Sequence, residues 1–85
     1  MDKEDRGRRA RALLDDPLLE QVLSGLDAQY VKAWRGAKTL EAREGAHRYI
    51  CLIERLKEDL SSQALTGALS ARRRAELEGR ERFWR

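Results

Sequence analysis

EAREGAHRYICLIERLKEDLSSQAL, residues 41–65, is the stretch that decides the fold of this chain. Apolar residues recur in it at alternating steps of three and four, which places them on one face of an α-helix. The residues of this stripe are Ala46, Tyr49, Ile53, Leu56 and Leu60. Ile50 and Leu52 flank the stripe on opposite sides, so the apolar face is wider than contact with one other helix requires. The pattern predicts a central helix with more than one packing partner.

Charge dominates the composition around this stretch. Charged residues make up 39% of the 85 residues, and aromatic residues make up only 6%. A chain of this length forms one small domain, and so many charges leave little apolar surface for a thick core. We therefore expect self-association, because a second copy would bury apolar surface that one chain alone leaves exposed.

The segment before the central helix predicts two further helices. Residues 3–14 read as a short charged helix, in which Gly7 weakens the first turn. A restart signal follows, because Asp16 can cap the free amide groups of a new helix and Pro17 suits its first position. A second helix is therefore expected from Pro17 to about residue 35, where Gly36 can end it.

A loop of three or four residues separates the second helix from Thr39, which can cap the central helix. So short a loop favours antiparallel neighbours, and residues 17–35 and 40–66 should form a helical hairpin. Tyr30 and Trp34 should meet Ala46 and Tyr49 close to the loop, where the small Gly45 and Ala46 leave room for the large Trp34. The expected hairpin core is Leu18, Val22, Leu26, Tyr30, Trp34, Ala46 and Tyr49.

The hairpin accounts for only part of the central apolar face. The rest should hold copies of the chain together, through Ile50, Leu52, Ile53, Leu56 and Leu60. The expected fold class is therefore all-α: a single domain, residues 1–85, built on an oligomeric antiparallel hairpin with a short N-terminal helix, residues 1–14. A basic C-terminal helix completes it, because Thr66-Gly67 favours an end or bend of the central helix and Ser70 can cap another. One long helix through residues 40–83 is the alternative.

The tail, residues 69–85, is the candidate surface for a partner protein or nucleic acid. Its candidate contacts are Arg72, Arg73, Arg80, Arg82, Phe83, Trp84 and Arg85. Arginine can hold phosphate and aromatic rings can stack on bases. Glutamates interleave with these arginines at helical spacing, however, so for most of them we prefer a solvated helix surface with i,i+4 ion pairs. The two aromatic residues either fold back on the hairpin or anchor a partner.

No catalytic or metal constellation can be assembled. Glu44 and His47 have the Glu-x-x-His spacing of di-iron bundles, but Glu20 and Asp27 lie off the apolar face of the neighbouring helix, so no metal site is expected. Cys51 has no evident base beside it, and no glycine-rich phosphate loop exists. We expect a non-enzymatic protein without cofactor. A charged N-terminus and the lack of a long apolar run predict neither signal peptide nor membrane contact.

Several segments together carry a likeness to a known group of proteins. They are RALLDDPLL at 11–19, YVKAW at 30–34, Arg43-Glu44, Leu60 and Gly67-Ala68. The pattern, which covers about residues 9–70, resembles small helical-hairpin proteins of tailed bacteriophages and prophages, encoded beside virion-structure and packaging genes. The resemblance implies a context, the host cytoplasm or the virion, and it supplies no catalytic residues.

Three functions follow as hypotheses. The first is a phage protein that self-associates and docks onto a virion or packaging protein. The second is a nucleic-acid-binding packaging or regulatory module that uses the basic tail. The third is an anti-defence oligomer that sequesters a host protein or an anionic nucleotide.

Overall fold

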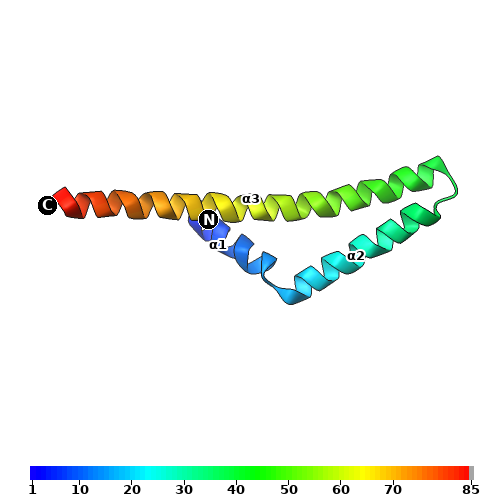
Figure 1. Ribbon diagram of the computed structural model, residues 1–85, viewed down its shortest axis with the longest axis horizontal. Helices are drawn as coiled ribbons and strands as arrows, with labels where there is room; N and C mark the ends of the chain where they lie inside the picture. Colours follow the sequence, from blue (N-terminus) through cyan, green and yellow to red (C-terminus); the bar gives the residue numbers. More distant parts are fainter. Residues whose placement is uncertain (85) are drawn as a thin grey trace.

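The computed structural model describes the backbone of residues 1–84 and the side chains of residues 1–80. Over this part the chain consists of three helices, α1 (Lys3–Leu14), α2 (Pro17–Gly36) and α3 (Leu40–Trp84), and contains no strand. The long α3 forms one edge of the molecule, and α1 and α2 lie along the same side of it as a bent arm (Figure 1). The molecule measures 71 × 24 × 19 Å. The all-α prediction is confirmed, in an extended shape.

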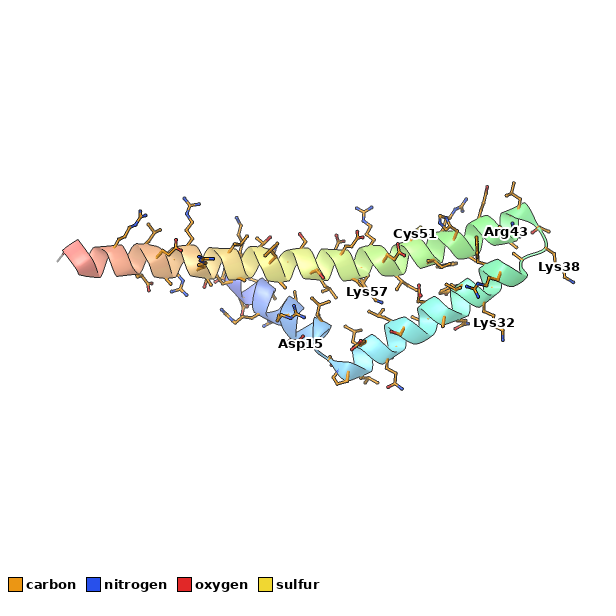
Figure 2. All side chains as sticks on the ribbon, in the orientation of Figure 1. Asp15, Lys32, Lys38, Arg43, Cys51 and Lys57 are labelled. Carbon is orange, nitrogen blue, oxygen red and sulfur yellow. The ribbon has the colours of Figure 1, made fainter. Side chains whose placement is uncertain are left out.

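The helix starts follow the local signals in the sequence. The Asp2 carboxylate accepts a hydrogen bond from the Asp5 amide at 2.7 Å, which caps α1. The Asp16 carboxylate accepts from the Leu18 amide at 2.9 Å, and Pro17 is the first residue of α2. The predicted break at Asp16 is confirmed, and Figure 2 places Asp15 at the corner between the two helices.

The connection between α2 and α3 is as short as predicted. α2 ends at Gly36, and the Thr39 hydroxyl caps α3 by accepting a hydrogen bond from the Ala42 amide at 3.1 Å. Lys38 lies in this connection (Figure 2). Ala37, rather than Gly36, is the C-cap of α2, and no described residue has a positive φ. A left-handed glycine is therefore not what ends α2.

α3 is one continuous helix, so the predicted end or bend at residues 66–69 and the separate helix from Ser70 are wrong. Gly67 is buried against α1 instead of ending a helix. A Cβ atom placed on Gly67 would lie 2.6 Å from the Gly7 Cα and 2.8 Å from the Lys3 carbonyl oxygen. Any side chain here would collide with the backbone of α1. Glycine is therefore present because two helices cross, at the cost that glycine carries inside a helix.

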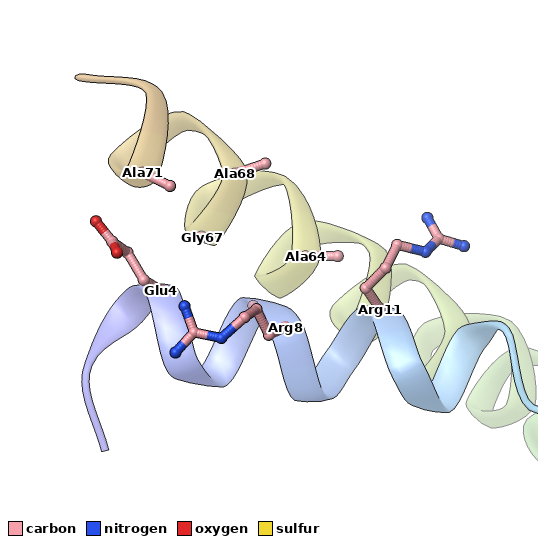
Figure 3. Close-up of a pocket in the computed structure, with 8 residues that line it drawn as sticks. Glu4, Arg8, Arg11, Ala64, Gly67, Ala68 and Ala71 are labelled. Atoms are coloured by element: carbon pink, nitrogen blue, oxygen red, sulfur yellow. The ribbon is translucent and has the colours of Figure 1, made fainter. Parts of the chain in front are cut away.

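The crossing is built from small residues on both helices. Gly7 and Ala10 of α1 are buried, as are Ala64 and Gly67 of α3. Figure 3 shows Ala64, Gly67 and Ala71 along the side of α3 that faces α1. A Cβ placed on Gly7 would lie 3.0 Å from the Gln63 carbonyl oxygen, so each glycine directs a Cα hydrogen at a carbonyl of the opposite helix. The two backbones are in direct contact, as small residues at helix interfaces allow.

A single stripe along α3 receives both other helices. Its buried and half-buried residues recur at steps of four and three: Ala46, Ile50, Ile53, Lys57, Leu60, Ala64, Gly67 and Ala71. α2 lies beside the first half of this stripe and α1 beside the second half (Figure 1). Near the connection, the rings of Tyr30 and Tyr49 stack with centroids 4.7 Å apart, which confirms that predicted contact.

The predicted hairpin core is wrong for much of α2. Leu23, one position after Val22, is the buried residue of this helix, whereas Leu18 is 67% exposed and Val22 48%. Trp34 is 40% exposed and lies under the Arg43 guanidinium, 5.9 Å from the ring centroid. It does not lie over Gly45, since no atom comes within 4 Å of a Cβ placed there. α2 diverges from α3 away from their connection, so it buries only one narrow stripe (Figure 1).

The contact between Gly7 and Gly67 can be tested by substitution, with a control substitution that is expected to change stability in the opposite direction. Gly67→Ala should lower the free energy of unfolding by about 1–3 kcal/mol, because its methyl group must push α1 off α3. Gly79→Ala, at a position with nothing within 4 Å of a Cβ, should raise it by up to about 1 kcal/mol through helix propensity alone. Urea denaturation followed by circular dichroism measures both. Stabilisation by both substitutions would show that α1 does not pack at Gly67.

Candidate interaction surface

One flank of the α2–α3 pair is lined mainly by uncharged residues. On each helix its residues follow the spacing of three and four that defines one helix face. We call this set the uncharged face: Leu18, Val22, Gly25, Leu26, Gln29 and Ala33 of α2, with Gly45, Tyr49, Leu52 and Leu56 of α3. Charged residues border this set on α3, where Arg48 follows Gly45 by three positions and Asp59 follows Leu56 by three.

The two halves of the uncharged face lie on the same side of the pair. Val22 directly precedes the buried Leu23, and Leu52 directly precedes the buried Ile53. When two helices pack antiparallel, the residue directly before a buried position lies on the same side of the pair in both helices. This follows because the second helix is reversed in chain direction and also faces the opposite way. Positions that follow the buried stripe lie on the opposite flank, where Glu20 and Glu54 are exposed. Apolar and charged flanks are thus segregated.

Large apolar side chains of the uncharged face are exposed to solvent. The exposed fractions run from 37% to 67% over Leu18, Val22, Leu26, Tyr49, Leu52 and Leu56. Exposed apolar side chains are typical of interaction sites where they form one contiguous patch of several hundred Å². Four further leucines of α3 are also exposed but lie outside this face: Leu40, Leu65, Leu69 and Leu77.

The structure places the residues of the predicted oligomer interface in different surroundings, some exposed and some buried within the single chain. Leu52 and Leu56 are exposed on the uncharged face. Ile53 is only 8% exposed and belongs to the core of the single chain, where Ile50 is half-buried. Leu60 lines a cavity of about 270 Å³ where the three helices meet. Sequence reasoning placed Leu18, Val22 and Leu26 of α2 in the hairpin core and missed that they are exposed.

Two of the four arginines in the described part of the basic tail, Arg72 and Arg74, form ion pairs. The Arg72 Nε lies 3.3 Å from the Glu76 carboxylate, and Arg74 Nη1 lies 3.1 Å from that of Glu78. These contacts confirm the i,i+4 pairs expected there. Of the other candidate contacts, Arg73 and Arg80 are exposed. Arg82, Phe83, Trp84 and Arg85 lie outside the residues whose side chains are described.

Arg74 also joins the two ends of the chain, a role that its sequence position did not indicate. Its Nε and Nη2 donate to the two carboxylate oxygens of Glu4 at 2.9 and 3.1 Å. The Glu4 side chain is only 18% exposed, so the carboxylate of this ion pair is largely covered where α1 meets α3. The hydrogen bond to Glu4 and, to a smaller extent, the one to Glu78 raise the pKa of the Arg74 guanidinium above its ordinary value, because both carboxylates favour its charged form.

The residues considered for metal binding and catalysis lie on the open surface of α3. Among the described residues, no group of three or more histidine, cysteine, aspartate or glutamate side chains could hold a metal ion. The expectation that no base stands beside Cys51 is wrong, because the His47 Nε2 lies 3.5 Å from its Sγ. Both side chains are exposed. A reactive thiol is favoured by an electropositive, partly enclosed setting, which this position on the helix does not supply.

Comparison with known proteins adds no relative. The chain matches no family model, and searches of curated proteins and of solved structures found no similar chain. The likeness to phage helical-hairpin proteins therefore stays a prediction. Within the described residues, no helix is both long and apolar enough to span a bilayer.

The Glu4–Arg74 contact predicts how firmly α1 is held. Glu4→Gln should increase amide hydrogen exchange throughout α1, because it removes the only ion pair that the described residues form between α1 and α3. Glu76→Gln is the matched control, since it breaks an ion pair within α3 alone and should leave α1 unchanged. High salt should act on the wild-type chain as Glu4→Gln does. Equal exchange in both variants would show that the pair does not hold α1.

Proposed function

We propose that this chain is a non-enzymatic phage protein that acts by self-association and by docking onto another protein in virion assembly or DNA packaging. The observation that carries the proposal is the uncharged face, with its six exposed large apolar side chains. The phage setting, in the virion or the host cytoplasm, rests on the resemblance of segments such as RALLDDPLL at 11–19.

In this proposal α2 and α3 act together as an antiparallel helical hairpin that presents the uncharged face. The stacked rings of Tyr30 and Tyr49 support such a unit, because they join the two helices next to their connection. α1 then serves as a brace, held to α3 by the glycine contact and by Glu4. The far end of α3, which extends beyond α1, is free to reach a partner protein (Figure 1).

The energy available from the uncharged face suits a reversible complex. Full burial of a large apolar side chain is worth roughly 1.5–3 kcal/mol, so covering six that are about half exposed contributes roughly 6 kcal/mol for each copy. Two copies gain about 12 kcal/mol, against an association cost of about 4–15 kcal/mol. At the lower end of that cost the balance of about 8 kcal/mol corresponds to a micromolar complex, and at the upper end no complex forms.

The nucleic-acid alternative is less well supported. At Arg72 and Arg74, phosphate groups would have to displace the carboxylates of Glu4, Glu76 and Glu78, which reduces the electrostatic gain at these two positions. Arg73 and Arg80 are exposed and are the described arginines on which this alternative depends.

Self-association can be tested with a pair of matched leucines. We expect the mass from light scattering after gel filtration to rise above the 9.8 kDa of one chain as concentration increases. Leu52→Glu should return the protein to a monomer, because it buries a charge in the interface. Leu65→Glu is the control, since Leu65 is also 61% exposed but lies off the uncharged face. A wild-type monomer up to hundreds of micromolar would refute the proposal.

A further inference from the structure

A polar cavity lies on one side of the crossing between α1 and α3. Its volume is about 390 Å³, which is within the range of sites that hold small ligands. α1 contributes Lys3 and Arg6 to its lining, and α3 contributes Asp59, Ser62, Gln63 and Thr66. The cavity thus combines two positive charges with two hydroxyl groups and one amide, the side-chain groups through which proteins hold phosphate oxygens.

The two cations of this cavity are open to a ligand. Lys3 and Arg6 are exposed, and neither forms an ion pair with a described residue. Arg6 donates one hydrogen bond of 3.4 Å to the Met1 carbonyl oxygen. Arg8, which lines another cavity of the same crossing, is instead paired with Asp5 at 3.2 Å. A phosphate group at Lys3 and Arg6 would therefore displace no carboxylate.

The carboxylate in the lining lies away from Lys3. A Cβ placed on Gly67 would lie 2.8 Å from the Lys3 carbonyl oxygen, so Lys3 lies beside the end of the lining that Thr66 forms. Asp59 precedes Thr66 by seven residues, which is about 10 Å along a helix. The Thr66 end of the cavity is therefore the part where a phosphate group meets positive charge with least repulsion.

The same face of α3 carries further positive charge beyond the cavity. Arg73 and Arg80 follow Thr66 by seven and fourteen residues, a spacing that keeps them close to one helix face. Both are exposed, and neither forms an ion pair with a described residue. The track from Thr66 to Arg80 is about 20 Å long. An extended chain of phosphates matches this length, whereas a single phosphate ion would occupy one end of it.

We infer that the phosphate backbone of a nucleic acid binds along this side of α1 and α3. One phosphate is held by Lys3, Arg6 and Thr66, and later ones are held by Arg73 and Arg80. A nucleic acid carries a negative charge at every nucleotide, so one molecule can serve all of these positions.

The fold is what assembles this surface. The tail by itself offers Arg73 and Arg80 as its described arginines without an ion pair, and the packing of α1 on α3 adds Lys3 and Arg6 to them. The inference goes beyond the proposed function, because it names a second kind of partner and does not require self-association.

The salt dependence of binding tests this inference. Fluorescence anisotropy of labelled duplex DNA, titrated with the chain at several salt concentrations, gives the slope of log affinity against log salt. Lys3→Gln and Arg6→Gln should each make this slope shallower by about 0.9, because each removes one phosphate contact. Arg8→Gln is the matched control, since it removes the same charge from the same helix but from a side chain already paired with Asp5, and the slope should not change.

Thr66→Val separates the cavity from undirected attraction by charge. It should weaken DNA binding by about threefold at an unchanged salt slope, because it removes a hydrogen-bond donor and no charge. Circular dichroism should show the same helix content in all four variants, since a positive charge near the start of α1 does not stabilise that helix.

Three results would overturn the inference. The first is a wild-type chain that does not bind DNA at low salt, and the second is an equal change of slope in Arg8→Gln. The third is competition by polyglutamate as strong as that by DNA of equal charge, which would assign the surface to an acidic protein. None of them bears on self-association, which is measured without DNA, so this inference and the proposed function can fail separately.

Discussion

The backbone contact between Gly7 and Gly67 fixes where α1 lies, and the rest of the fold follows from that position. α1 is pressed against α3 so closely that a methyl group on either glycine would meet backbone atoms. The Asp15-Asp16 corner then starts α2 beside the middle of α3, and the short connection at residues 37–39 brings its other end back to the start of α3. α2 must therefore span this distance at a tilt, which leaves the 270 Å³ cavity where the three helices meet.

The tilt decides how the apolar residues of α2 are used. A helix that diverges from its neighbour buries a narrow stripe, here centred on Leu23, and leaves the adjacent seam in water. The exposed seam carries no charged residue, although charge covers most of the remaining surface. The same geometry that builds the single chain thus produces the surface on which the proposed self-association depends.

The paired charges contribute to solubility and local helix stability more than to a recognisable site. Most ion pairs among the described residues join side chains three or four positions apart on one helix and are largely exposed, so each contributes little. The Arg74–Glu4 pair is different, because it joins residues 70 positions apart and Glu4 is mostly covered. It reinforces the crossing that the two glycines permit.

Local chemistry in the sequence was sufficient to predict α1, α2 and the start of α3, but not how far α3 extends. Asp16 and Thr39 cap helices with their own side chains, and the periodicity around Ile53 identifies a helix with one buried face, since both effects act within a few residues. Tertiary structure alone decided the meaning of Gly67 and the choice between neighbouring seams on α2. In the sequence, a glycine that ends a helix cannot be distinguished from a glycine that lets another helix backbone approach. Val22 and Leu23 are likewise both apolar, so the sequence does not show which of them is buried. The approach of α1, more than 50 residues from Gly67 along the chain, decides the first outcome, and the packing of α2 on α3 decides the second.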